Sequence, residues 1–355
     1  IAFVGLLVSC KPATERRTEV SIMGNAFYID GAVTYRGRYW NGNKVEGLLM
    51  NARLVQGVFD DSNPETRKLF HYPDTGEWDP DRNTDEFVAA MPSWREHGLL
   101  SFTLNLQGGS PTGYGNKNWY NSAFTTKGDL KPAYMDRLTR ILDEAETLKM
   151  VVILGYFYFG QDQNLDDESA VVAAVDNVTD WLLEKGYRNV LVELNNESNI
   201  KAYDHEILKP ARVHELIERV RSKRKNGFRL LVSTSFGGRY IPDANVVAVS
   251  DYVLIHGNGV KDPAFIKEMV ELTKAVSTYR GQPIVFNEDD HYEYDQDANN
   301  FKYAVESYAS WGYFDFRRKG ETDIKTGYQS VPVDWSISDE RKKAFFDYLK
   351  EVTGE

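Results

Sequence analysis

Two glutamates, Glu197 and Glu288, each end a short apolar run of the chain, and each directly follows an asparagine. The two runs, residues 189–197 and 283–288, have the length of buried strands. Side chains at the carboxyl ends of parallel strands meet at one rim of an α/β barrel. Two carboxylates that face each other there are the minimum equipment for cleaving a glycosidic bond, one as proton donor and the other as nucleophile or base. The pattern therefore predicts this chemistry.

Each glutamate alone could equally form a salt bridge or cap a following helix. Asp289 directly follows Glu288, which leaves open a catalytic role for Asp289 or a small calcium site. The segment lacks the spacing of an EF-hand, and successive residues at a strand end point to opposite sides. We therefore expect Glu288 to be the reactive group, and we expect neither a metal nor another cofactor.

Strand-length apolar runs recur along the whole chain, and several are apolar at consecutive positions. Consecutive apolar residues are typical of parallel strands that are buried on both faces. The eight predicted strands are residues 53–59, 99–106, 150–157, 189–195, 229–235, 252–256, 283–287 and 310–316.

Amphipathic stretches with helical spacing lie between these runs. The predicted helices are residues 84–97, 132–149, 168–185, 211–225, 262–277, 298–309 and 338–352. The eightfold alternation predicts an α/β fold, a (β/α)8 TIM barrel, and residues 20–31 predict a short N-terminal β-hairpin. The alternative, a doubly wound open sheet, lacks its usual GxGxxG turn.

The segment 193–197, ELNNE, at the end of the fourth predicted strand resembles clan A of the glycoside hydrolases, and the resemblance spans roughly residues 45–355. It implies that Glu197 is the acid/base, that Glu288 on the seventh strand is the nucleophile, and that Asn196 binds the sugar 2-hydroxyl. A nucleophile about 5 to 5.5 Å from the acid/base would give retention of configuration. We also expect the negative charge of Glu288 to raise the pKa of Glu197.

Other polar side chains at predicted strand ends could contact a sugar. Arg53 could hold the nucleophile ionised or pair outside the barrel, and His256 ends the sixth strand, where the clan commonly has His or Tyr against the nucleophile. Arg317 opens a basic triplet that suits a uronate or sulfate group, although such triplets are usually solvated. The remaining candidates for substrate binding are Asn105, Gln107, Tyr156 and Tyr158.

Composition excludes several classes of protein. The chain has 53 acidic and 42 basic residues, a net charge of -11, which argues against a nucleic-acid partner. GxSxG, Walker and HExxH motifs are absent from the sequence, so serine hydrolase, nucleotide and zincin readings fall away. A lyase or isomerase that uses one glutamate as base would usually need a metal or phosphate site.

The first ten residues are apolar and end at Cys10, the single cysteine of the chain. They resemble the second half of a bacterial lipoprotein signal, with an ordinary secretory signal as the alternative. We expect residues 1–19 to be a truncated signal and linker, and residues 20–355 to be a single catalytic domain. The expected protein is an exported monomer in the periplasm or at the cell surface, anchored only by lipid at Cys10.

The sequence thus predicts a retaining glycoside hydrolase that acts on a polysaccharide or oligosaccharide, with an anionic glycan as one option. The alternative is a surface lipoprotein that binds glycans on a barrel scaffold without cutting them. The presence of both Glu197 and Glu288 speaks against that alternative, because binding alone needs neither carboxylate.

Overall fold

The computed structural model describes residues 18–115 and 117–355. The predicted lipidation site Cys10 and most of the predicted linker lie outside these residues. Within the described ranges, no helix is long and apolar enough to cross a membrane.

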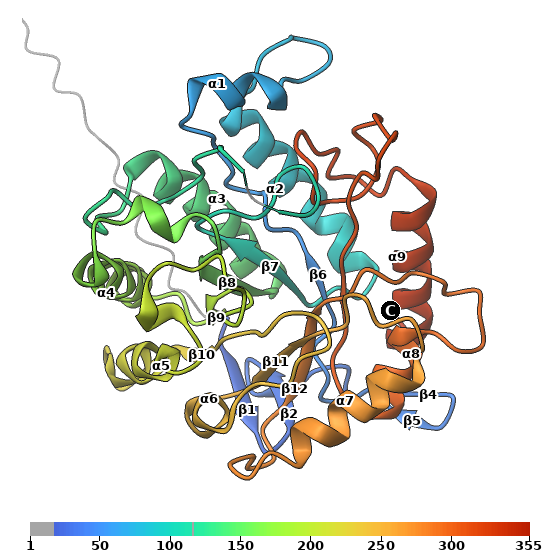
Figure 1. Cartoon of the computed structure of the whole chain (residues 1–355). Helices are drawn as coiled ribbons and strands as arrows, with labels where there is room; N and C mark the ends of the chain where they lie inside the picture. The colour runs from blue at the N-terminus through green and yellow to red at the C-terminus, as the bar shows by residue number, and fades with distance from the viewer. Residues whose placement is uncertain (1–17, 116) are drawn as a thin grey trace, which may run out of the picture.

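Eight parallel strands form the centre of the molecule, and helices surround them (Figure 1). One sheet has the order β10-β9-β8-β7-β6-β13, and β11 pairs with β12 in parallel. Parallel bridges between Val285 and Ser310 and between Asp289 and Tyr313 join β12 to β13, and the amide of Asp251 bonds the carbonyl of Val232 beside β10. The predicted (β/α)8 barrel is confirmed. Its strands are β6 (Asn51–Arg53), β7 (Ser101–Asn105), β8 (Val151–Phe157), β9 (Val190–Asn195), β10 (Leu231–Ser233), β11 (Val253–His256), β12 (Ile284–Glu288) and β13 (Gly312–Tyr313).

Each predicted helix is present, because its apolar face packs on the strands. Helix α4, for example, has the N-cap Asp167, which accepts from the amide of Ala170, and ends at Gly186 in the left-handed region. The helices are α1 (Pro64–Arg67), α2 (Pro80–Glu96), α3 (Pro132–Leu148), α4 (Glu168–Lys185), α5 (Val213–Ser222), α6 (Ala244–Val249), α7 (Ala264–Lys274), α8 (Asn300–Glu306) and α9 (Glu340–Thr353), with short 3-10 turns at Lys68–Phe70, Asp162–Asn164 and Glu206–Leu208.

The predicted N-terminal hairpin is also present, as β1 (Val20–Met23) paired antiparallel with β2 (Ala26–Ile29). A third strand, β3 (Ala32–Val33), follows the turn at Asp30 and Gly31. A second small ribbon, β4 (Tyr39–Trp40) and β5 (Asn43–Lys44), precedes the barrel. In Figure 1, β1 and β2 lie below the barrel strands, and β4 and β5 lie beside α8.

The first barrel strand differs from its prediction. It covers Asn51–Arg53, whereas the sequence predicted a strand at 53–59. Residues 54–59 begin the long connection from β6 to α2, and they are buried. Within this connection, Phe59 packs with Phe70 and Trp78 in a separate aromatic cluster. Burial in a loop and burial in a strand give the same apolar pattern, so periodicity could not separate them.

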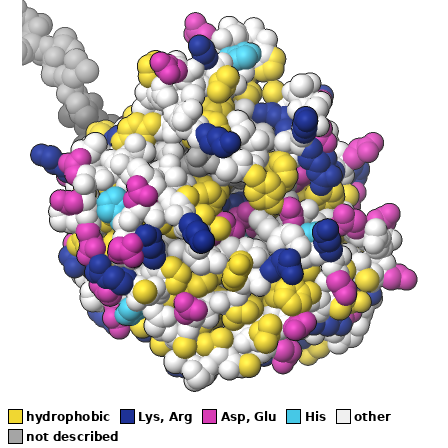
Figure 2. Space-filling model, in the orientation of Figure 1, with side chains coloured by type: hydrophobic (Ala, Val, Ile, Leu, Met, Phe, Trp, Pro, Cys, Tyr) yellow, Lys and Arg dark blue, Asp and Glu magenta, His cyan; other side chains and the backbone are white. Residues whose placement is uncertain are grey.

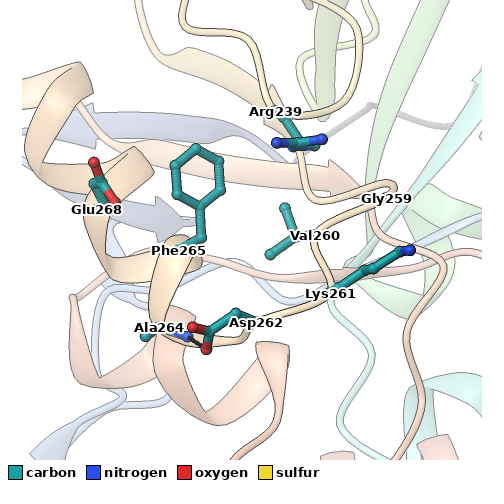
Figure 3. A pocket seen from close by; sticks show the side chains of 8 residues that line it. All are labelled: Arg239, Gly259, Val260, Lys261, Asp262, Ala264, Phe265 and Glu268. Atoms are coloured by element: carbon teal, nitrogen blue, oxygen red, sulfur yellow. Dashed lines mark hydrogen bonds between the residues drawn. The ribbon is translucent and has the colours of Figure 1, made fainter.

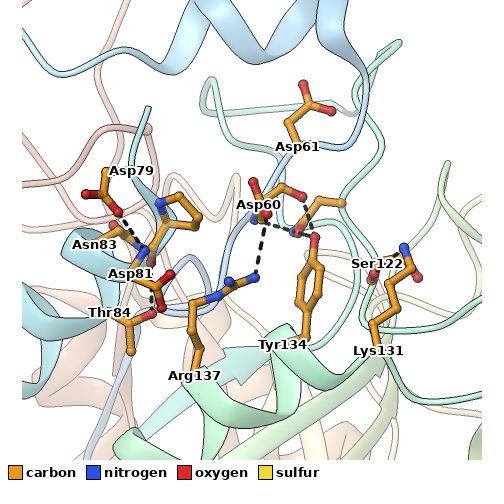
Figure 4. A network of polar contacts seen from close by, with 12 residues as sticks. Asp60, Asp61, Asp79, Asp81, Asn83, Thr84, Ser122, Lys131, Tyr134 and Arg137 are labelled. Atoms are coloured by element: carbon orange, nitrogen blue, oxygen red, sulfur yellow. Dashed lines mark hydrogen bonds and ion pairs between the residues drawn. The ribbon is translucent and has the colours of Figure 1, made fainter. Parts of the chain in front are cut away.

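A polar network fixes the same connection to the barrel (Figure 4). Asp61 accepts from the amides of Asn63 and Tyr120 at 2.9 and 2.8 Å, and the Tyr134 hydroxyl donates to the carbonyl of Asp60. Arg137, which is buried on α3, lies 3.8 Å from the Asp60 carboxylate. The bonds from Tyr134 and Arg137 tie this loop to α3, so the network has a structural role.

Candidate active site

The two predicted catalytic glutamates meet at the carboxyl ends of the barrel strands. Glu288 is the last residue of β12, and Glu197 lies two residues after the end of β9. One oxygen of each carboxylate and one ring nitrogen of His256 all lie within 4.8 Å of one another. His256 Nδ1 is 3.0 Å from Glu197 Oε1 and 3.6 Å from Glu288 Oε2. The structure thus brings together Glu197, Glu288 and His256.

Glu197 has an unusual backbone conformation, with φ at 51°. A non-glycine residue in the left-handed region is uncommon and costs about 1 kcal/mol or more, so the surrounding structure must hold it. Its amide donates to Ser235 Oγ at 2.9 Å, and Ser235 follows β10, the neighbouring strand. This bond fixes the turn that directs the Glu197 carboxylate toward Glu288.

Glu288 is paired with a buried cation. Arg53 Nε lies 2.9 Å from Glu288 Oε2, and both side chains are almost completely buried. The Arg53 Nη2 also donates to Asn196 Oδ1 at 3.1 Å, and Asn258 Nδ2 donates to Glu288 Oε1 at 2.6 Å. Arg53 therefore faces the barrel centre, and it orients both Glu288 and Asn196.

The pKa of Glu197 differs from the expectation of the sequence analysis, in which the charge of Glu288 raises it. Burial tends to raise the pKa of Glu197, but the hydrogen bond and charge of His256 outweigh it and lower that pKa. Burial raises the pKa of Glu288, against the opposing charges of Arg53 and His256. Burial would lower the pKa of His256, but the two carboxylates raise it above its ordinary value. His256 Nδ1 is thus the favoured holder of the proton in the free site, not Glu197, because it lies between two anions.

Two of the other predicted contacts serve the structure instead. Tyr156 is buried and its hydroxyl bonds Thr179 of α4, so it points away from the barrel mouth and the prediction that it contacts a sugar is wrong. Gln107 donates to Ser122 Oγ and to the carbonyl of Gln161, so it ties the connections after β7 and β8 together.

Tyr158, by contrast, lies beside the site. Its ring centroid is 6.0 Å from the Arg53 guanidinium, and its hydroxyl bonds Ser110 Oγ at 2.8 Å. Strand β8 ends at Phe157, so the strict alternation stops there and the side chain of Tyr158 turns to the centre.

Asn105 lies in the barrel interior against Gly155. A Cβ on Gly155 would come within 2.3 Å of Asn105 Oδ1, so only glycine fits that position of β8. Arg317 lines a separate groove beyond β13.

Sequence reasoning missed two polar residues of the site. Asn258, which binds Glu288, stands two residues after His256, so its position past a strand end was a usable signal. Tyr114 belongs to the long connection after β7, and its hydroxyl donates to Asp290 Oδ2 at 2.6 Å. A loop residue of this kind carries no periodicity that could have identified it.

A cavity of about 500 Å³ lies beside the site, between the connections that follow β10 and β11 (Figure 3). The amide of Arg239 on its wall donates to the carbonyl of His256, so the cavity adjoins the cluster of His256, Glu197 and Glu288. The guanidinium of Arg239 is 5.8 Å from the ring centroid of Phe265, and Figure 3 shows both side chains and Val260 facing the cavity. A flat apolar face and a guanidinium are a suitable surface for a sugar ring.

Known proteins resemble this chain in fold but not in sequence. No family model and no curated protein sequence matches the chain. The solved structures that are similar to the chain include glycoside hydrolases with a (β/α)8 fold, several of them of family 5, a family of clan A.

Three of these structures illustrate the similarity. A family 5 glycoside hydrolase from Bacteroides vulgatus has 14% identity and a TM-score of 0.58 over 94% of this chain and 70% of its own. A family 5 mannosidase from Rhizomucor miehei has 12% identity and a TM-score of 0.55 over 96% and 98%. A putative glycoside hydrolase from Bacteroides vulgatus has 14% identity and a TM-score of 0.54 over 91% of this chain, which spans 60% of that protein's length. At such identities the similarity establishes the fold alone.

Proposed function

We propose that this protein is a retaining glycoside hydrolase, with Glu288 as nucleophile and Glu197 as acid/base. The observation that carries the proposal is the pair of carboxylates within 4.8 Å at the barrel mouth, with Arg53 bound to Glu288 alone of the two. A separation of about 5 to 5.5 Å between carboxyl groups is typical of retaining enzymes, and inverting enzymes need about 6.5 to 9.5 Å to admit a water.

In the first step, Glu288 attacks the anomeric carbon and a proton passes to the leaving oxygen. Arg53 and Asn258 hold the Glu288 carboxylate in place, and the ion pair with Arg53 favours its charged form. The proton comes from the pair of Glu197 and His256, which share it across 3.0 Å. Negative charge that develops on the leaving oxygen draws this proton through Glu197 to the substrate.

In the second step, water hydrolyses the glycosyl ester of Glu288. Formation of the ester removes the negative charge of Glu288, and the loss of this charge lowers the pKa of Glu197 and His256. Glu197 then acts as base toward the attacking water and passes the proton back to His256. Asn196 has its Oδ1 bound to Arg53, while its buried Nδ2 has no partner among the described residues, so it can donate to a sugar hydroxyl.

The similar structures suggest where to look for substrates. They include a mannosidase, a β-mannanase with bound mannohexaose and a broad-specificity endoglucanase. We therefore propose β-linked mannan and glucan oligosaccharides as the first panel.

Proton NMR of the first product formed tests the proposal. We expect wild-type protein to release a sugar with the anomeric configuration of the substrate. Release of the opposite anomer would disprove the retaining mechanism. Binding of oligosaccharides without any turnover would favour the alternative, a glycan-binding protein on a barrel scaffold.

A further inference from the structure

A second groove lies on the opposite side of the barrel mouth from the cavity in Figure 3. Its volume is about 480 Å³, and its walls come from the long connections after β6, β7 and β13. Leu69, Phe70, Tyr114 and Phe316 form apolar and aromatic parts of the wall. We refer to it as the basic groove because Arg317, Arg318 and Lys319 line it together.

The side chains of the three cations form no close ion pair within the described part of the chain, although the charges of Glu321 and Asp323 act on Arg318 and Arg317 from a longer distance. No carboxylate oxygen there lies within 4.0 Å of a side-chain nitrogen of Arg317, Arg318 or Lys319, although most arginines among the described residues form such pairs. Glu321, which also lines the groove, binds Arg341 with both of its oxygens, at 2.8 and 3.0 Å. Three adjacent cations without an ion pair on one wall of a groove leave their positive charge available to a ligand.

Both guanidinium groups are held in position. Arg317 Nη1 and Nη2 donate to the carbonyls of Pro332 and Val331, each at 2.8 Å. Burial lowers the pKa of Arg317 to about 10, so it remains protonated at neutral pH. The guanidinium of Arg318 lies 4.9 Å from the ring centroid of Tyr292. Groups held in this way lose little entropy when they bind an anion.

The basic groove is connected to the catalytic cluster. Tyr114 lines the groove and donates to Asp290, which lies two residues after Glu288. On the adjacent wall, Pro111 follows Ser110, whose hydroxyl bonds Tyr158 beside Arg53. Figure 2 shows basic side chains around a hollow at the centre of the viewed face, in which acidic side chains are visible. A glycan chain that reaches Glu288 can therefore extend into the groove.

From these observations we infer that the basic groove binds an acidic group of the glycan, either the carboxylate of a uronic acid or a sulfate ester, on a sugar unit beyond the one that is cleaved. The inference rests on the proposed glycosidase function. Two guanidinium groups and an ammonium group recognise such anions by charge and by paired hydrogen bonds. The aromatic wall formed by Tyr114 and Phe316 covers the apolar face of the same sugar.

Binding measurements test this inference without requiring catalysis. Affinity gel electrophoresis of the full chain uses polygalacturonate as the uronate probe, dextran sulfate as the sulfate probe and dextran as the neutral probe. We expect at least one anionic probe to retard the wild type and dextran not to. Arg318→Gln/Lys319→Gln should weaken binding of that probe about tenfold or more, since hydrogen bonds to charged groups contribute strongly.

Two further variants make the result specific. Arg224→Gln/Lys225→Gln removes two exposed cations from the connection between α5 and β10, at the other end of the barrel, and should leave the affinity unchanged. Arg317→Lys keeps the charge but loses the planar fork, so it should weaken binding several-fold. The probe that is retarded identifies uronate or sulfate as the ligand.

The inference is overturned if neither anionic probe retards the wild type, or if the control pair weakens binding as much as the groove pair. Failure of the proposed function has a different signature, because anion binding would persist while neither the neutral oligosaccharides of the panel nor the retained anionic polysaccharide was cleaved.

Discussion

Two adjacent carboxylates at the end of β12, Glu288 and Asp289, are both buried but have opposite surroundings. Asp289 accepts from Trp311 Nε1 at 2.9 Å, from Asn300 Nδ2 at 2.9 and 3.1 Å, and from His291 Nδ1 at 2.8 Å. Glu288 has Arg53 and Asn258 on one side and faces His256 and Glu197 on the other.

The difference shows how one strand end separates stability from reactivity. Successive side chains of a strand point to opposite faces, so Glu288 faces the barrel centre and Asp289 faces α8. Donors surround the carboxylate of Asp289, which leaves it no position for a substrate. A second carboxylate 4.8 Å or less from Glu288 is a repulsive contact that folding alone would avoid. The proposed mechanism therefore assigns reactivity to Glu288, the less satisfied of the two groups.

The largest expected effect comes from removal of the nucleophile. Glu288→Ala should lower kcat by about 10⁴-fold or more, because no other carboxylate can form the glycosyl ester. Azide fits the space left by the side chain and should restore turnover of an activated aryl glycoside, with a glycosyl azide of inverted configuration as the product. Full activity of Glu288→Ala would transfer the role to another residue, and Asp289→Ala is the matched comparison at the neighbouring position.

A smaller loss of activity is expected at the partner carboxylate. Glu197→Ala should reduce kcat/KM by about 10² to 10⁴ for substrates with a poor leaving group, the usual range for general acid catalysis. The loss should be much smaller for an aryl glycoside whose leaving group needs no proton. Azide should here give a product of retained configuration, opposite to that of Glu288→Ala. Equal losses for both kinds of substrate would contradict the assignment of Glu197 as acid.

Asp289, the other carboxylate of the comparison, should contribute to stability and not to catalysis. Asp289→Asn replaces one acceptor oxygen with a donor that faces the donors of Trp311 and Asn300. We expect a loss of about 2 kcal/mol in the free energy of unfolding, measured by urea denaturation, with activity per folded molecule kept within about tenfold. Asp290→Asn, at the next and more exposed carboxylate, is the control and should cost less. A loss of activity that exceeds the loss of folded protein would give Asp289 a direct catalytic role.

Much of this arrangement could be predicted from the sequence, because it depends on where buried runs end. The apolar runs before Glu197 and Glu288 determine the strands, and a barrel brings the carboxyl ends of its strands together. Arg53 was identified even though its strand was predicted to begin where it in fact ends. A residue at the start of the first strand lies near one rim of the barrel, and a residue at its end lies near the other. The structure was therefore needed to show that Arg53 lies at the rim that holds the two glutamates.

The remaining features depend on local geometry that has no periodic signal. The left-handed backbone of Glu197 is set by a bond to Ser235, on a neighbouring strand and 38 residues away in sequence. Tyr156 and Tyr158 look alike in the sequence, yet the end of β8 between them sends one to α4 and the other to the site. The position of the proton depended on His256, since the sequence alone did not show that its Nδ1 lies between both carboxylates.

The smallest expected effect, a shift in pH dependence, concerns that proton. Two carboxylates raise the pKa of His256, so its protonated form stabilises the fold fully below its unfolded pKa of about 6.5, and this contribution is lost as pH rises through the higher folded value. In His256→Asn the proposed acid is Glu197 alone, whose carboxyl binds a proton less tightly than an imidazole between two anions. The alkaline limb of kcat/KM should therefore move to lower pH, and the pH dependence of unfolding above about pH 6.5 should become weaker.

A tyrosine side chain in the same region provides the control: Tyr158→Phe removes a hydroxyl that bonds Ser110 and should leave the alkaline limb in place. If His256→Asn leaves that limb unmoved as well, the acidic proton resides on Glu197 alone and His256 does not hold it.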